Sequence, residues 1–286
     1  MLHRYLVPHL LAPMLLCVPV FPLQEKPAQE KPQEEKAGQK TPAPKRIQRR
    51  GDKKAIEAAD RTSDAYGGIV ALALFRQRGQ LRGLIKLFND DGSFREGNIT
   101  IRFLRRLSKT EDLKRVDLEI PGSPILSIGF DGEKIWGAEN GQSIVLRLRA
   151  EKIFQAELSK NYETLVRNRE LVHELKYVGR EKKSGIEFDL IDLLPPDGDP
   201  VHYSVSTKSL RILHLEFEVA MPRVDKPIQV RDSFFDFREV QNTLVPFRLE
   251  RYENDRRVHE IQFTEIAYGI TLEESIFKSA DDLRPK

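Results

Sequence analysis

The sequence offers few side chains whose type and spacing could support catalysis or metal binding. Its six histidines never recur at the i, i+4 spacing with which two imidazoles bind one metal ion from a helix. The single cysteine, Cys17, excludes an intrachain disulfide and a metal site built from cysteines. The histidines are His3, His9, His173, His202, His214 and His259.

Two groups of carboxylates could in principle act in catalysis or bind a cation. Asp236 and Glu239 lie on either side of Arg238 and form one candidate pair. No G-x-S-x-G motif occurs, and Gly137–Gly141 lacks the lysine of a phosphate-binding loop. We therefore expect no metal, no cofactor and no enzymatic activity, with a catalytic site scattered over several strands as the alternative. The second group surrounds a Pro-Pro turn at a spacing that fits no calcium-binding loop, and consists of Asp189, Asp192, Asp197 and Asp199.

Large apolar side chains at strand-like positions are the remaining candidates for a binding site. Alternating polarity places such residues on one face of a sheet, but it does not say whether that face is packed core or an open cavity. For Trp136, core packing is favoured over a role as a ligand platform. The candidate cavity residues are Ile101, Phe103, Leu118, Trp136, Phe188, Phe217, Phe237 and Phe247.

Strand-like runs joined by short turns dominate the chain from Leu81 onward. The clearest case is 230–277, where three runs are separated by Gln241-Asn242 and Asn254-Asp255, residue pairs that tolerate tight turns. Consecutive strands of this kind argue against a parallel sheet with crossover helices. Further strands are expected at residues 81–88, 98–104, 113–120, 125–130, 134–137, 143–148, 171–178, 185–193, 202–206 and 210–219.

Three segments have a helical pattern instead. Residues 52–66 gather alanine and isoleucine on one side, and Gly67-Gly68 follows as a plausible end. The apolar run 69–75 is rich in alanine, which favours a second helix. Residues 150–166 place apolar side chains at spacings of four, four and three, which predicts one amphipathic helix. We expect these helices to cover the apolar face of the antiparallel sheet.

Residues 1–23 are typical of an export signal. Arg4 precedes the apolar run Leu10–Phe21, which is too short for a comfortable membrane span. Cys17 follows apolar residues as in a lipoprotein box, although Leu16 occupies the place of a small residue. We expect export to the periplasm with a cleaved signal, and a lipid anchor or an uncleaved anchor are the alternatives.

Residues 24–51 predict a disordered tether, because they are rich in Pro, Glu, Lys and Arg and hold one large apolar residue, Ile47. Basic residues between Lys45 and Lys54 could contact a membrane surface or another envelope component, although a solvated tether is favoured. Residues 24–54 hold ten Lys or Arg and five Asp or Glu, Arg4 adds one positive charge, and residues 55–286 therefore carry a net charge of −3. This acidic domain argues against a nucleic-acid partner.

Four groups of segments carry a resemblance to a known family. They are Val116–Gly122, the D-G-x-x-x-W hairpin Asp131–Trp136, Phe235–Val240 with Leu244–Phe247, and Glu265-Ile266 with Ser275–Phe277. These segments resemble the LolA/LolB-like superfamily, which includes outer membrane lipoprotein-sorting proteins and the stress-signalling protein RseB. The resemblance spans roughly residues 80–280 and concerns structural motifs. Two segments depart from it: the turn Gln241-Asn242 replaces a turn that usually contains glycine, and Gly269–Thr271 replaces a closing Asn-Pro-Pro.

The resemblance implies an α+β fold for residues 52–286, a single domain in which a strongly curved antiparallel β-sheet forms an open half-barrel with helices covering its concave face. It also implies a non-enzymatic carrier whose apolar cavity binds the acyl chain of a lipid or a lipoprotein. The alternative is an envelope interaction or sensor module related to RseB, without lipid transport.

Overall fold

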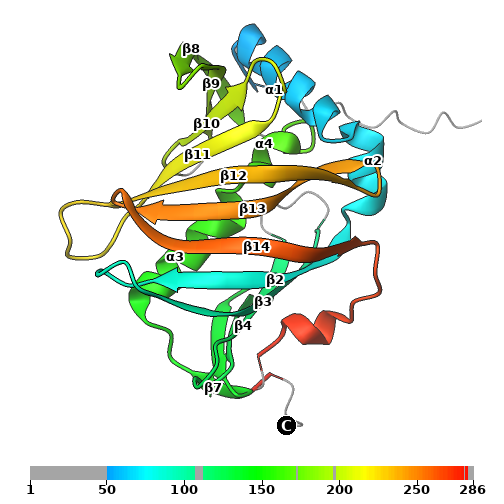
Figure 1. Cartoon of the computed structure of the whole chain (residues 1–286). Coiled ribbons are helices and arrows are strands. Elements are labelled where there is room, and N and C mark those ends of the chain that lie inside the picture. Colours follow the sequence, from blue (N-terminus) through cyan, green and yellow to red (C-terminus); the bar gives the residue numbers. More distant parts are fainter. Residues whose placement is uncertain (1–49, 107–111, 172, 196–197, 280, 283–286) are drawn as a thin grey trace, which may run out of the picture. The chain divides into compact units, whose positions relative to one another are not determined.

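Fourteen strands form one open sheet in the part of the chain that the structure describes (Figure 1). This structure is a computed structural model, and it describes residues 50–286 except 107–111, 172, 196–197, 280 and 283–286. The predicted signal and nearly all of the predicted tether lie outside these residues, so the predicted domain boundaries stay predictions.

The strands follow the chain in two long meanders. In chain order they are β1 (Arg50–Gly51), β2 (Arg78–Phe88), β3 (Phe94–Leu104), β4 (Leu113–Glu119), β5 (Leu126–Phe130), β6 (Ile135–Glu139), β7 (Gln142–Ile144), β8 (Glu174–Lys183), β9 (Ile186–Leu194), β10 (Val201–Ser206), β11 (Ile212–Val219), β12 (Ile228–Val240), β13 (Thr243–Glu253) and β14 (Arg256–Tyr268).

The pairing of β14 with β2 joins the two meanders into one sheet. The order is β1-β8-β9-β10-β11-β12-β13-β14-β2-β3-β4-β5-β6-β7, and the sheet does not close on itself. All neighbours are antiparallel except β1 and β8, which pair in parallel over two residues. The antiparallel half-barrel predicted from the sequence is confirmed.

Four α-helices and one 3-10 helix accompany the sheet in the described residues. They are α1 (Lys53–Ala65), α2 (Gly68–Phe75), α3 (Leu148–Ser159), α4 (Tyr162–Val166) and η1 (Glu274–Phe277). Figure 1 shows α3 and α4 behind the central strands, on the concave face of the curved sheet. The predicted helices at 52–66 and 69–75 are confirmed as α1 and α2.

The prediction of one helix over 150–166 is wrong. The chain leaves helical geometry at Lys160 and Asn161, and Asn161 begins α4 because its side chain accepts a hydrogen bond from the Thr164 backbone N–H. This is the usual role of asparagine at a helix start. The predicted strand at 143–148 is also too long, since β7 ends at Ile144 and α3 begins at Leu148.

The tight turns predicted from residue type are confirmed. Both central residues of the β12–β13 turn, Gln241 and Asn242, have positive φ angles of 49° and 59°. The β13–β14 turn repeats this at Asn254 and Asp255, with 49° and 62°. Such turns match the twist of the strands that they connect.

The apolar side chains form two clusters. The first packs α1, α4 and the strands β8–β12 around residues such as Tyr66, Leu215 and Phe217, which are almost fully buried. The second lies on β2, β3, β13 and β14 and includes Ile85 and Phe263. Eleven partly buried apolar residues surround the second cluster, so its cover is less complete.

The C-terminal segment covers the only tryptophan. Trp136 donates from Nε1 to the Phe277 carbonyl oxygen at 2.6 Å, and Phe277 itself is fully buried. Gly129 lies opposite Trp136 on β5, where an added Cβ would come within 2.4 Å of the indole ring. Glycine at this position therefore makes room for the tryptophan.

Replacing Phe277 by alanine should detach this cover. We expect Phe277→Ala to lower the free energy of unfolding by about 3–5 kcal/mol, because it leaves a cavity, and to shift Trp136 emission to longer wavelength. Urea denaturation followed by tryptophan fluorescence measures both effects, with the exposed neighbour variant Lys278→Ala as control. Unchanged emission in Phe277→Ala would show that the segment does not shield Trp136.

Candidate functional site

The eight predicted cavity residues do not meet in one place. Ile101, Phe103, Leu118 and Phe247 belong to or border the second apolar cluster. By contrast, Phe217 belongs to the first apolar cluster and Phe237 borders it. Trp136 and Phe188 are buried but belong to neither cluster.

Trp136 and Phe188 are buried outside both apolar clusters. Trp136 lies under the C-terminal segment, as favoured from the sequence. Phe188 packs against the ring of His214 at a centroid distance of 6.0 Å, and alternation along β9 puts it on the face opposite to Ile191, a residue of the first cluster. The strand pattern identified both as large apolar residues, but could not assign them to a face.

Half-buried apolar residues form a continuous strip across β2–β5. Leu81 pairs with Ile101, Ile101 with Val116, and Val116 with Ile128, so their side chains share one face. Phe103 and Leu118 lie on the same face of β3 and β4 by alternation. The apolar strip is defined by Leu81, Ile101, Phe103, Val116, Leu118 and Ile128, all of intermediate exposure.

The apolar strip faces the helices. Lys114 has the same orientation on β4 as Val116 and Leu118, and its Nζ lies 3.2 Å from a carboxylate oxygen of Glu157 on α3. The ammonium group also lies over the ring of Phe154, a buried residue of α3. The strip is therefore part of the concave face, beside α3.

Ion pairs fix α3 to the sheet. Arg251 on β13 binds both oxygens of Asp232 at 2.6 Å and also binds Glu157 of α3. Despite burial, which favours the neutral acid, Arg251 and Lys114 lower the pKa of Glu157 to about 2. Burial and the nearby Arg251 lower the pKa of His259 to about 3, so its imidazole is neutral at pH 7.

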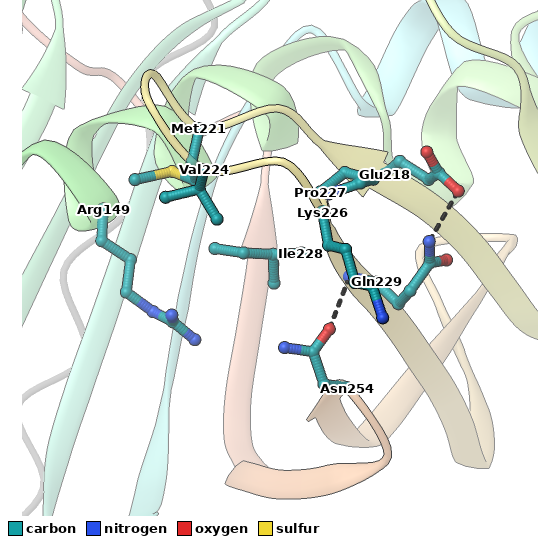
Figure 2. Close-up of a pocket in the computed structure, with 9 residues that line it drawn as sticks. All are labelled: Arg149, Glu218, Met221, Val224, Lys226, Pro227, Ile228, Gln229 and Asn254. Atoms are coloured by element: carbon teal, nitrogen blue, oxygen red, sulfur yellow. Dashed lines mark hydrogen bonds between the residues drawn. The ribbon is translucent and has the colours of Figure 1, made fainter.

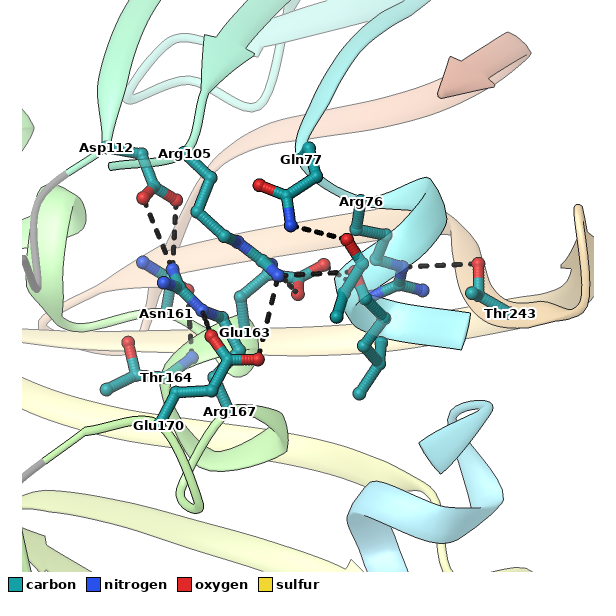
Figure 3. A network of polar contacts seen from close by, with 12 residues as sticks. Arg76, Gln77, Arg105, Asp112, Asn161, Glu163, Thr164, Arg167, Glu170 and Thr243 are labelled. Atoms are coloured by element: carbon teal, nitrogen blue, oxygen red, sulfur yellow. Dashed lines mark hydrogen bonds and ion pairs between the residues drawn. The ribbon is translucent and has the colours of Figure 1, made fainter. Parts of the chain in front are cut away.

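A second set of ion pairs fixes α4 (Figure 3). The fully buried Arg76, just after α2, binds Glu163 of α4 at 2.5 Å and donates to Thr243 of β13 at 3.2 Å. Arg105 lies 3.5 Å from the other Glu163 oxygen. Burial opposes ionisation of Glu163, but Arg76 and Arg105 outweigh it and hold the pKa of this carboxyl below its usual value. Arg167, just after α4, extends the set by binding Asp112 at 3.1 Å.

These charges have structural partners that account for them. Removing one member of a buried pair leaves an unpaired charge and costs about 3–5 kcal/mol, whereas a complete pair contributes little net stability. The two sets therefore determine where α3 and α4 lie more than how stable the protein is. Within the described residues, no group of three His, Cys, Asp or Glu side chains could hold a metal ion.

Several of the candidate carboxylates from the sequence also have partners. Asp236 forms a two-point ion pair with Arg238 on the surface. Asp189 accepts from the Tyr177 hydroxyl at 2.8 Å and from Arg180 at 3.0 Å. Asp192 lies 2.7 Å from a ring nitrogen of His202. Asp197 lies outside the described residues, so the predicted absence of a calcium site at the Pro-Pro turn stays a prediction.

A pocket of about 590 Å³ is lined by none of the eight predicted residues (Figure 2). It is formed by the β11–β12 connection and the start of α3, and most of its lining is apolar. Its floor, Ile228, is buried in the first cluster. No periodicity marks this connection in the sequence, so strand patterns could not find it. The lining residues are Arg149, Glu218, Met221, Val224, Lys226, Pro227, Ile228, Gln229 and Asn254.

The pH dependence of stability should report the ion pair of Glu157. Because its pKa is lowered from 4.5 to about 2, the folded protein favours the ionised state of Glu157, and this contribution to stability is present above pH 4.5 and lost as the pH falls towards 2. We expect Glu157→Gln to lower the free energy of unfolding at pH 7 by about 3 kcal/mol, since it leaves Arg251 undercompensated. The difference in free energy of unfolding between Glu157→Gln and the unsubstituted protein should shrink as the pH falls from 4.5 towards 2.

Urea denaturation over this pH range tests the prediction. The matched control is Glu57→Gln, which removes an exposed glutamate from α1. A difference between Glu157→Gln and the unsubstituted protein that stays constant from pH 7 to pH 2 would contradict the assigned role of Glu157.

Comparisons with other proteins identify the fold. No protein-family model matches the sequence, and no curated protein matches it significantly. Among solved structures, a LolA superfamily protein from Nitrosomonas europaea aligns with a TM-score of 0.54 and 14% identity, over 79% of this chain and 98% of that one. None of the helices in the described residues is long and apolar enough to cross a membrane.

Two further structures align over similar lengths. A domain assigned as an outer membrane lipoprotein-sorting protein from Vibrio parahaemolyticus has a TM-score of 0.52 and 12% identity, over 78% of this chain and 96% of that one. A DUF1329 family protein from Desulfovibrio piger has a TM-score of 0.54 and 12% identity, over 79% and 96%. Such identities establish the fold alone: the described chain has a LolA-like fold.

Proposed function

We propose that this protein is a non-catalytic carrier of the cell envelope, which binds the acyl chain of a lipid or a lipoprotein along the apolar strip. The observation that carries this proposal is the strip itself, six half-buried apolar residues that run across four strands on the face lined by α3. The fold agrees with this role, since one structure of similar fold is assigned as a lipoprotein-sorting domain.

The location of the carrier rests on the sequence. The charged and apolar pattern of residues 1–23 favours export, so we place the protein in the periplasm. The absence of thiols from residue 18 onward suits an oxidising compartment. We propose a cleaved signal, with a lipid anchor or an uncleaved anchor as the alternatives, and none of the three alters the binding face.

An acyl chain gains free energy at the strip through burial alone. Each methylene removed from water contributes about 0.8 kcal/mol, and no polar group is needed to hold it. The first cluster offers less room, because most of its residues, including Leu215 and Phe217, are almost completely buried. We therefore propose Ile101, Phe103 and Leu118 as ligand contacts, with Phe247 at the border. Phe217 and Phe237 would contact ligand only if the first cluster repacked.

Binding of a fluorescent fatty acid tests this proposal. We expect the full-length protein, stripped of lipid, to bind the probe, and Ile101→Ser and Val116→Ser each to weaken binding by about tenfold because the strip loses apolar surface. Fluorescence titration measures the affinity. Val178→Ser, an equivalent change at an exposed position on β8, is the matched control.

The same titration separates the carrier from an envelope interaction module. A folded protein that binds no probe, and that carries no lipid in native mass spectrometry after purification from membrane extract, would contradict the carrier role. Specific capture of an envelope membrane protein by such lipid-free material would then favour the interaction module. Equal probe affinity in both strip variants and the control would place the ligand elsewhere.

A further inference from the structure

Two chain connections that each contribute residues to the pocket also expose apolar side chains. Residues 144–149 lead from β7 into α3, and residues 220–227 join β11 to β12. Val145 is 97% exposed, Leu148 46% and Val224 58%. Figure 2 shows Val224 and Met221 across the pocket from Arg149. Single exposed apolar residues are ordinary on protein surfaces, but here three belong to two connections that share one pocket.

Positive charge accompanies these apolar residues. The first connection holds Arg147 and Arg149, and the second holds Arg223 and Lys226 against one carboxylate, Asp225, so together they carry a net charge of +3. The opposite sign of the domain as a whole, −3 for residues 55–286, makes this a local feature.

Three of the four cations on these connections are accessible to a binding partner. Arg149 is already paired with Glu253. The other three cations are exposed, and no ion pair involves them among the described residues. They are Arg147, Arg223 and Lys226.

We propose that residues 144–149 and 220–227 form a docking surface for a membrane that contains anionic phospholipid. Aliphatic side chains flanked by exposed Arg and Lys suit the bilayer interface, where the former enter the acyl region and the latter meet phosphates. An acidic protein partner would meet the same charges, and the experiment below therefore includes it as an outcome. The docking surface goes beyond the proposed carrier function and does not require it.

The exposed apolar helix α2 is the strongest competing surface. Its Val70 is 71% exposed, yet the helix carries no charged side chain. Gly67, just before α2, lies against Asn242 at the far end of β12, whereas the pocket contains Ile228 at its beginning. Twelve residue steps cover about 40 Å along the path of a strand, so a probe at one site reports independently of the other.

Site-specific fluorescence tests the docking surface in the full-length chain. Cys17 is the only cysteine, so a Cys17→Ser background allows an environment-sensitive dye to be attached at Val145→Cys, with Val70→Cys and Val178→Cys as controls. Vesicles of phosphatidylethanolamine and phosphatidylglycerol should shift the emission to shorter wavelength at position 145 only. Vesicles of phosphatidylcholine alone should produce a much smaller shift.

Two double variants, each lacking two cations, test whether membrane binding depends on the charges of the docking surface. We expect Arg147→Gln with Lys226→Gln to raise the lipid concentration needed for half of the shift by about 30-fold, because each cation near an anionic surface contributes separately. Lys182→Gln with Lys183→Gln, two exposed cations of β8, should leave it unchanged.

The proposal fails under any of three results. The first is no shift at position 145 with anionic vesicles, which is also the result expected if the protein binds membranes through residues 1–23 alone. The second is a shift at position 70 instead of position 145. The third is a shift at position 145 that polyglutamate causes and vesicles do not. The last result would assign the surface to an acidic polypeptide. None of these measurements involves the apolar strip, so a failed docking surface leaves the carrier proposal to its own test.

Discussion

The ion pairs from Arg251 and Arg76 to the helices determine what the concave face can do. Arg251 holds Glu157 of α3, and Arg76 holds Glu163 of α4, from positions that are almost fully buried. A buried guanidinium needs its carboxylate, because leaving either charge alone costs several kcal/mol. The helices are therefore fixed over one half of the sheet, and the cover of the other half is incomplete.

This unequal cover links packing to function. Under α1 and α4 the first cluster is nearly free of exposed apolar area, whereas β2–β5 keep a row of half-buried residues centred on Ile101 and Val116. A half-buried apolar row gains free energy when another apolar group completes its burial. The proposed ligand site thus follows from where the helices are fixed, without any catalytic or metal-binding group.

The sequence predicted elements well and faces poorly. Local residue types were sufficient for the turns at Gln241-Asn242 and Asn254-Asp255, because three of these four residues are Asn or Asp, which tolerate positive φ angles. The break between α3 and α4 was missed because an amphipathic pattern can continue across a capping residue such as Asn161. The sequence predicted Ile101, Leu118 and Phe188 alike as cavity residues, but only the first two lie on the strip. The reason is that strand alternation defines two faces without saying which one a helix covers. The long-range partners of Arg76 and Arg251 leave no local signal at all.

A paramagnetic fatty acid tests the central claim that the apolar strip is the binding face. In methyl NMR spectra of the full-length protein, a nitroxide on the acyl chain broadens signals of nearby side chains. We expect selective broadening of Ile101, Val116 and Leu118, with Ile212 and Val205 of the first cluster unaffected. Broadening confined to the first cluster, or equal broadening of both regions, would contradict it.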